Sequence, residues 1–222
     1  MLTVHHLNNS RSQRVLWLLE ELGLPYQVVR YQRGPDMRAP AELQKVHPLG
    51  KSPVIEDQGR LLAETGAIVE YLIETYGQGR LIPPAASEAR RAYTYWLHYA
   101  EGSAMPLLLL KLVFMRLPTG VPFLLRPIIG AVAAKAQARL TDPQLATHMR
   151  CWANALQAGN GWFAGGEFSA ADVMMSFPLE AAAARMGLRP EHQPIADFLG
   201  RIHARAAYKR ALEQGGPYEL LR

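Results

Sequence analysis

A short stretch between His47 and Thr65 constrains the fold of this chain more than any other part of it. Its first half is a turn with Pro48 and Pro53, and each proline ring fixes one backbone angle and removes one amide donor. Its second half brings Glu64 and Thr65 to the expected start of a helix. The stretch therefore predicts a rigid turn followed by a helix that opens with an acid and a hydroxyl.

Those parts suit a ligand that is itself a short peptide with charged ends. An extended peptide needs backbone partners for its amides, and the chain around Ser52-Pro53 can supply them if the turn is rigid. The ammonium of such a peptide needs a carboxylate, which Glu64 offers. Its carboxylate suits the helix N-terminus at Thr65, where unpaired amides and the positive end of the helix dipole lie. The stretch is therefore interpreted as a peptide-binding site.

The first part of the chain shows the alternating patterns of a small α/β unit. Apolar residues recur at strand spacing in short runs and at helix spacing in longer ones. The expected strands cover 2–7, 26–31, 53–56 and 60–63, and the expected helices cover 11–22, 41–46 and 65–76. The order is βαβαββα, which predicts an α/β domain over 1–80.

The rest of the chain predicts helices only. A proline-rich linker over 81–86 leads into a helical domain over 87–222. A long helix starts at Ser87, and Pro106 should kink or break it. The segment 107–132 is apolar, and buried packing is its default interpretation, with a membrane surface or a subunit contact as alternatives.

One later helix start carries a specific signal. Ser169 and Asp172 have the spacing of a capping box, in which each side chain accepts from the other residue's backbone amide. This signal predicts a helix boundary and says nothing about chemistry.

Composition excludes several classes of protein. The chain has 222 residues, 49% of them hydrophobic and 19% charged, which predicts two modest globular domains. Its net charge of +5 is scattered, without the basic and aromatic stripe that nucleic acid requires. Neither a run of about 18 apolar residues nor an export signal is present, so we expect a cytoplasmic protein that does not associate with membranes.

Cysteine and histidine usage predicts neither a disulfide nor a metal site. Cys151 is the only cysteine, and we expect it to be a buried structural thiol. His5 and His6 alternate across a strand, and no other ligand completes a set at recognisable spacing.

Taken together, these motifs resemble the glutathione transferase superfamily. The matching residues are Ser10-Arg-Ser-Gln-Arg14, Pro48-Leu-Gly-Lys-Ser-Pro-Val, Glu64-Thr65-Gly-Ala-Ile and Phe168-Ser-Ala-Ala-Asp172, which are spread over both halves of the chain. The first of them is most similar to bacterial and fungal members of the kind first described in yeast. The resemblance implies a thioredoxin-like first domain, an all-α second domain and a homodimer. It also implies that glutathione serves as co-substrate and that no cofactor is needed.

The resemblance also implies roles for the residues around the proline turn. Pro53 would be a cis-proline, and the backbone of Ser52 would pair with the cysteinyl part of glutathione. Glu64 and Thr65 would hold the γ-glutamyl end. Three residues are candidates for the glycine carboxylate, of which the cationic one is favoured: Gln44, His47 and Lys51.

Catalysis in this family means presenting glutathione as a thiolate. A free thiol has a pKa of about 8.5, so it is mostly protonated near neutral pH. Ser10 occupies the position of the family's catalytic residue, where its hydroxyl would donate to the sulfur. Asn8, Asn9 and Ser12 are substitutes for that role, and Ser10 could instead be a simple helix N-cap.

The second substrate would be a hydrophobic electrophile bound by the helical domain. Tyr99, Met105 and Phe114 are candidates to line its pocket, although helix core is the simpler interpretation of each. Two other functions stay open. One is glutathione-dependent reduction of peroxides or disulfides, and the other is non-catalytic binding or regulation by a protein of the same fold.

Overall fold

The first domain is built on a four-stranded mixed sheet. The computed structural model describes residues 1–34, 36, 38–218 and 220. The strands are β1 (Leu2–Leu7), β2 (Tyr26–Tyr31), β3 (Val54–Asp57) and β4 (Arg60–Ala63). The helices are α1 (Ser12–Leu22), α2 (Glu42–Val46) and α3 (Thr65–Tyr76). The strand order is β2-β1-β3-β4, with β1 parallel to β2 and the other neighbours antiparallel. The predicted order βαβαββα and the thioredoxin-like fold are confirmed.

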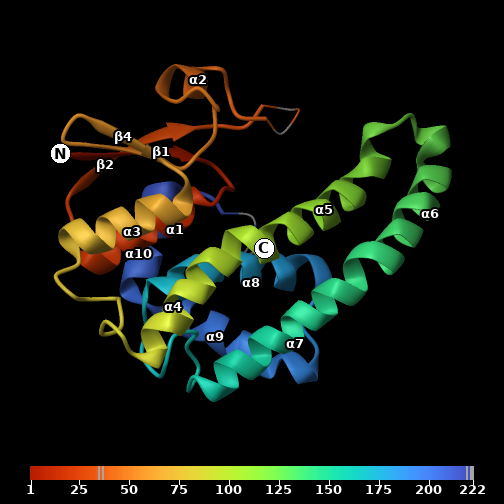
Figure 1. Cartoon of the computed structure of the whole chain (residues 1–222). Helices are drawn as coiled ribbons and strands as arrows, with labels where there is room; N and C mark the ends of the chain where they lie inside the picture. Colours follow the sequence, from red (N-terminus) through yellow and green to blue (C-terminus); the bar gives the residue numbers. More distant parts are fainter. Residues whose placement is uncertain (35, 37, 219, 221–222) are drawn as a thin grey trace.

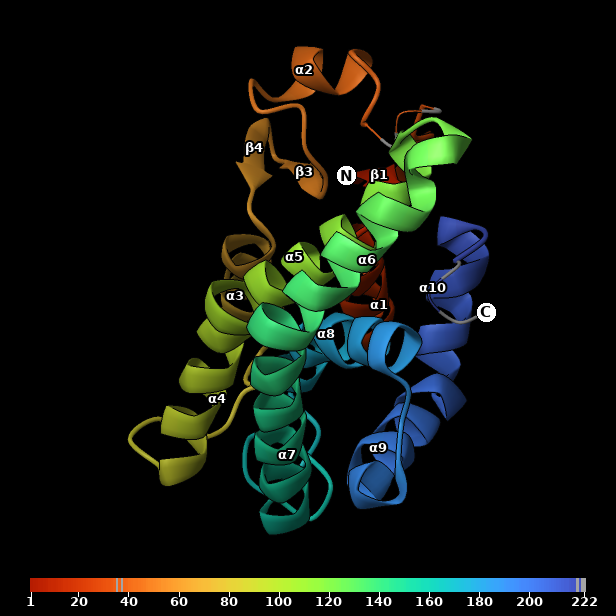
Figure 2. The same ribbon diagram turned by 90° about the vertical axis from the view of Figure 1, so that its right-hand side faces the viewer.

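The sheet has helices on both faces. In Figures 1 and 2, α1 and α3 lie between the sheet and the second domain, whereas α2 lies on the outer side. Most of α1 is buried because it packs against the sheet on one side and helices of the second domain on the other. The β3–β4 hairpin turns at Gln58 and Gly59, both at positive φ, as a two-residue turn requires.

The second domain is all helical. Its α-helices are α4 (Glu88–Tyr99), α5 (Met105–Arg116), α6 (Arg126–Ala136), α7 (Asp142–Ala158), α8 (Ala170–Met186), α9 (Gln193–Ala204) and α10 (Ala206–Gly215). Helix α8 occupies the centre, where its residues 170–182 are all buried. Apolar residues all around a helix suit such a position, and the buried Asp172, Ser176 and Glu180 are hydrogen-bonded there. The division into domains at 81–86 stays a proposal.

Two predicted helix boundaries agree with the structure. The hydroxyl of Ser87 accepts the Arg90 amide at 3.1 Å, which caps α4. The carboxylate of Asp172 accepts the Ser169 amide at 2.8 Å, and the capping box at the start of α8 is complete. Burial raises the pKa of Asp172 to about 7, although its hydrogen bonds, led by that from the Phe163 amide, act in the opposite direction.

Pro106 changes the helix geometry without ending the helix. Its ring lacks an amide hydrogen, so the bond back to the carbonyl of Gly102 cannot form. A π-helical turn, Ala100–Ala104, ends two residues before it and joins α4 to α5. The expected kink therefore takes the form of a widened turn.

Two expectations about burial are wrong. Cys151 is exposed on α7, because the buried face of this amphipathic helix is formed by its neighbours Met149, Trp152 and Ala153. Most of the segment 107–132 is not packed into the core either, although Leu108 is buried there. The segment forms most of a helical hairpin, and ten of its large apolar side chains are exposed in the described chain.

Candidate active site

Sheet topology brings three separate segments to one edge of the first domain. In the sheet, His5 near the end of β1 lies opposite Val54 at the start of β3. Val54 in turn lies opposite Ala63 at the end of β4. The loop after β1, the proline turn before β3 and the helix start after β4 therefore meet at the same edge. Ser10, Ser52 and Glu64 stand on these three segments.

The proline turn is attached to β1 through a side chain. The Ser52–Pro53 peptide bond is cis, as the family resemblance implies. The Ser52 hydroxyl donates to the His5 carbonyl at 2.8 Å and accepts the Leu7 amide at 3.1 Å. The backbone pairing of β1 with β3 ends at His5. The Ser52 hydroxyl therefore supplies hydrogen-bond partners for two backbone groups at the end of β1. No backbone hydrogen bond within the described residues uses the Ser52 amide or carbonyl, so both can meet a ligand.

Glu64 is held in a strained backbone conformation at the start of α3. Its φ is +70° and its ψ is +121°, a combination that residues with a side chain rarely adopt. Its carboxylate is exposed, whereas the neighbouring Thr65 is buried. Such strain costs about 1–3 kcal/mol and is concentrated at functional sites. The conformation therefore supports a ligand role for Glu64.

The residues expected at the glycine end lie on and after α2. Gln44 and Lys51 are exposed and His47 is half-buried, so their side chains can reach solvent or a ligand. Gly50 turns the chain between them at a φ of +57°, and a Cβ there would lie 2.7 Å from the Gln44 side chain. Only glycine fits this turn without displacing Gln44.

A chain of buried hydrogen bonds runs from the loop after β1 into the sheet. The Ser10 and Ser12 hydroxyl oxygens are 2.7 Å apart, and the Ser12 hydroxyl lies 2.8 Å from Nδ1 of His6. The Ser10 oxygen also accepts the Ser12 amide at 3.2 Å. All three side chains are buried. The sequence gives no signal for the His6 contact, because it depends on how α1 lies against β1.

His6 is neutral in this environment. Burial lowers the pKa of His6 to about 4, the charge of Arg30 adds to the lowering, and a hydrogen bond with the Gly215 backbone opposes it. The hydrogen bond with the Gly215 backbone raises the pKa of His6, so the imidazole ring is its donor. Because Nδ1 faces Ser12, we assign the proton of the neutral ring to Nε2. Nδ1 then accepts from the Ser12 hydroxyl. This direction leaves the Ser10 proton to be donated to Ser12 or to a ligand.

The buried His6 should make the protein less stable as the pH falls. Between pH 6.5 and about 4 the unfolded chain binds a proton at this ring and the folded chain does not, so acidification favours unfolding. The full shift corresponds to a loss of about 3 kcal/mol of unfolding free energy. Urea unfolding of the wild type and His6→Gln, compared at several values in this pH range, should show the weaker pH dependence in the variant. Equal dependence in both proteins would contradict the assignment.

The two asparagines that sequence reasoning offered as substitutes lie in the loop between β1 and α1. The Asn8 side chain accepts the Arg33 amide at 2.9 Å, so it holds the loop that follows β2. Asn9 is half-buried with a φ of +50°, a conformation that asparagine tolerates. The Asn8 contact gives that residue a structural role.

An acid that sequence reasoning did not single out joins the two domains next to this loop. Glu101 pairs with Arg11 at 2.5 Å and also with Arg14. Burial raises the pKa of Glu101, but the two guanidinium groups outweigh burial and hold the pKa below its usual range. One feature of the sequence could have pointed to Glu101. It is an acid within a helical stripe that includes the buried Leu97 and Leu108.

The candidates for an electrophile pocket have different environments. The Tyr99 hydroxyl lies 2.5 Å from Nδ1 of His148 and accepts from Trp152 at 3.1 Å, so it is directed toward α7. Met105 is buried in the core, and Phe114 is half-buried on the outer part of α5. Their role in binding a second substrate stays a prediction.

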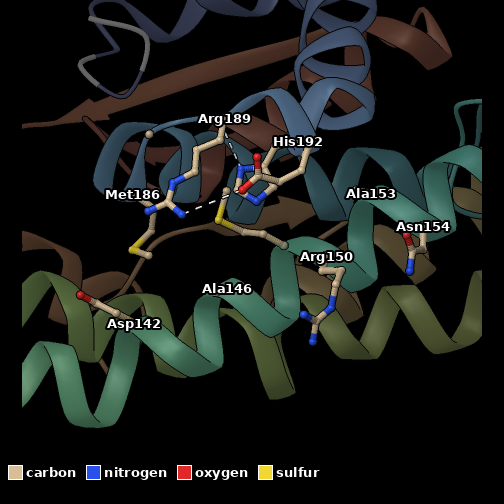
Figure 3. A pocket seen from close by; sticks show the side chains of 11 residues that line it. Asp142, Ala146, Arg150, Ala153, Asn154, Met186, Arg189 and His192 are labelled. Carbon is tan, nitrogen blue, oxygen red and sulfur yellow. Dashed lines mark hydrogen bonds and ion pairs between the residues drawn. The ribbon is translucent and has the colours of Figure 1, made fainter.

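A separate cavity of about 420 Å³ opens within the second domain. It is lined by residues of α7, the end of α8 and the turn that follows, among them Arg150, Met186 and Arg189 (Figure 3). Arg189 is paired with Glu191 at 3.9 Å, and its amide donates to His192 at 3.2 Å. None of the predicted site residues lines this cavity.

Comparisons with known proteins identify the family. Residues 1–74 match the family model described as glutathione S-transferase, N-terminal domain. Over 222 residues the chain is 32% identical to glutathione S-transferase 1 of Saccharomyces cerevisiae, with 96% of this chain and 95% of the relative covered. This chain belongs to the glutathione S-transferase family.

Two further comparisons support membership of the glutathione S-transferases over the whole length of the chain. Glutathione S-transferase 3 of Schizosaccharomyces pombe is 33% identical over 220 residues, which cover 96% of this chain and 88% of the relative. A crystal structure of a glutathione S-transferase from Actinobacillus pleuropneumoniae superposes with a TM-score of 0.80 at 30% identity, covering 100% of this chain and 96% of that one. Both glutathione S-transferase domains are therefore present.

Proposed function

We propose that this protein is an enzyme that activates the thiol of glutathione for attack on hydrophobic electrophiles. The observation that carries the proposal is the meeting of three segments at one edge of the sheet. One segment presents backbone groups at Ser52, one a strained carboxylate at Glu64 and one a hydroxyl at Ser10. These groups match the amides, the ammonium and the thiol of a γ-Glu-Cys-Gly tripeptide.

Each end of glutathione then has a partner in this proposal. Glu64 binds the ammonium of the γ-glutamyl residue, and Thr65 with the α3 N-terminus binds its carboxylate. The Ser52 backbone pairs with the cysteinyl amide beside Pro53. The glycine carboxylate faces the turn after α2, where Gln44, His47 and Lys51 are candidates and Lys51 adds the charge.

Ser10 is the proposed donor to the thiolate. The Ser12 proton is committed to His6, so Ser12 has none left for a ligand. The Ser10 proton can turn from Ser12 to a sulfur, while its oxygen keeps the Ser12 amide. A hydrogen bond to a charged acceptor contributes about 1.5–3 kcal/mol, enough to lower a thiol pKa by about 1–2 units. The thiolate then attacks the electrophile, and Tyr99, Met105 and Phe114 stay candidates for the electrophile pocket.

We also propose a homodimer in the cytoplasm, in keeping with the family resemblance. Tyr95 on α4 is 54% exposed, and its ring contacts the buried Trp96 edge-to-face and the half-buried Tyr99 at a tilt, which holds one aromatic side chain at the surface of the second domain. Exposed aromatic residues are enriched where proteins associate. Sedimentation velocity of the purified protein would give the mass directly, and a monomer would contradict the proposal.

The proposed activity is tested by binding and by turnover. Calorimetric titration of the folded protein with glutathione should show saturable heat, and absence of heat would overturn the proposal. Turnover with glutathione should then be compared for chlorodinitrobenzene, cumene hydroperoxide and a mixed disulfide. A clear preference for the first substrate supports transfer, whereas a preference for either of the others assigns the enzyme to glutathione-dependent reduction.

Two substitutions of Glu64 can separate the contribution of its carboxylate to glutathione binding from the effect of its strained backbone on stability. Glu64→Ala should weaken glutathione binding about 10- to 100-fold, because a charge-assisted contact is lost. Glu64→Gly should weaken binding equally, but it should be about 1 kcal/mol more stable than Glu64→Ala, since glycine adopts the φ of +70° without strain. Calorimetry and urea unfolding measure the two effects. Unchanged affinity in both variants would exclude the carboxylate from the site.

A further inference from the structure

The exposed apolar side chains of the described chain are concentrated in one place. Of its seventeen exposed large hydrophobic residues, ten lie between residues 109 and 132. The most exposed are Phe123 and Leu124, each at 72%, followed by Ile128 at 63%. The others are Leu109, Leu110, Val113, Met115, Leu117, Leu125 and Val132. A cluster of this kind marks a surface that another body covers.

This cluster occupies a hairpin that projects from the molecule. Helix α5 runs outward and α6 returns beside it, and two short 3-10 turns at the tip join them, Leu117–Gly120 and Phe123–Leu125. In Figures 1 and 2 the tip of the hairpin stands beyond the bundle formed by α7, α8 and α9. Helix α6 packs chiefly against α5 and the adjoining turns. The tip can therefore meet a flat surface without obstruction from the bundle.

The charges on the hairpin are all of one sign. No acid occurs between Glu101 and Asp142, whereas five basic residues do. Lys111 is buried and paired with Asp142 at 2.6 Å. The other four are exposed, and none of them has an ion pair within the described residues: Arg116, Arg126, Lys135 and Arg139. The apolar tip thus lies among unpaired cations.

We propose that this hairpin docks on an anionic phospholipid surface, with Phe123 and Leu124 inserted and the cations against the headgroups. Apolar side chains next to lysine and arginine are the combination that interfacial binding requires. No helix of the described chain is long and apolar enough to cross a membrane, so the hairpin lies on the surface. The inference does not rest on glutathione chemistry, and it replaces the expectation from sequence that the protein avoids membranes.

Charge argues against a second copy of this chain as the occupant. A two-fold contact between the hairpins of two copies would bring the unpaired cations of both together, with no acid on either hairpin to offset them. Anionic lipid instead neutralises each of them. The attraction between one cation and an anionic membrane surface increases partitioning of the protein onto the membrane roughly fivefold.

The test is co-sedimentation of the full chain with vesicles. We expect binding to vesicles of phosphatidylcholine mixed with phosphatidylglycerol, weak binding to phosphatidylcholine alone, and release by high salt. Phe123→Ser/Leu124→Ser should lower the partition coefficient at least tenfold. The matched control, Leu61→Ser/Leu188→Ser, removes two exposed apolar residues elsewhere and should bind like wild type. Arg116→Glu/Arg126→Glu should lose binding, and Lys209→Glu, also exposed, should not.

Three results would overturn the proposal. The wild type could stay in the supernatant with every vesicle, or both serine pairs could reduce binding to the same extent. Alternatively, sedimentation velocity could show that Phe123→Ser/Leu124→Ser alone converts a dimer to a monomer, which would make the hairpin a contact between copies. Circular dichroism and thermal unfolding confirm that each variant is folded, and the surface position of these residues predicts that they are.

Discussion

Ser10→Ala should lower turnover with chlorodinitrobenzene about 10- to 100-fold at a pH below the ordinary thiol pKa, while glutathione affinity changes little. The proposed Ser10 hydrogen bond is much stronger with the ionised sulfur than with the thiol, so its loss raises the pKa of the bound thiol. The ultraviolet absorbance of thiolate in the glutathione complex, followed against pH, measures that pKa directly. We expect it to rise by about 1–2 units in the variant.

Ser12→Ala is the control for this experiment, because Ser12 lies in the same buried chain of hydrogen bonds. It should keep most of the turnover, since the Ser12 hydroxyl is committed to His6 and Ser10 retains its own proton. Its thermal stability should fall, because Nδ1 of His6 loses its donor. A larger loss of turnover in Ser12→Ala than in Ser10→Ala would transfer the role to Ser12.

Arg14→Met should destabilise the protein by about 3 kcal/mol. The Arg14 side chain is only 1% exposed, donates to the Met174 carbonyl at 2.8 Å and pairs with Glu101. Removing one partner from a buried ion pair leaves polar groups uncompensated in the interior. Because Arg14 belongs to α1, while Glu101 and Met174 belong to the second domain, the loss should weaken the joint between the domains. Urea unfolding measures the change in free energy.

Arg11→Met is the matched control, since it removes the other arginine from the same carboxylate. Its side chain is 41% exposed, so water can replace most of what it supplies. We expect a loss of less than about 1 kcal/mol. Equal destabilisation of the two variants would contradict the view that burial makes the Arg14–Glu101 pair contribute more to stability than the Arg11–Glu101 pair.

Local patterns predicted the elements of the first domain almost residue by residue. The turn at Gln58-Gly59 and the helix ending at Tyr76 are set by neighbours in sequence. The same holds for the capping box of Ser169 and Asp172, whose partners are three residues apart. Helix starts, tight turns and the period of apolar residues depend on interactions of short range.

Contacts between distant segments were not accessible in this way. The bond between Ser12 and His6 depends on the angle at which α1 crosses β1. The pairing of Arg14 with Glu101 joins residues 87 positions apart. Neither contact follows from periodicity, because periodicity shows which face of an element is buried and not what the face meets.

Residue patterns were enough to predict the order of elements, the family and the residue types at the edge of the sheet, because these follow from local backbone preferences and from motif spacing. Three other features depend on how distant segments pack: the strained conformation of Glu64, the contact between Ser12 and His6, and the exposure of the α5–α6 hairpin. An apolar run such as 107–132 looks the same in a sequence whether or not it is covered. Only the positions of the other helices show that nothing in the described chain packs over its tip.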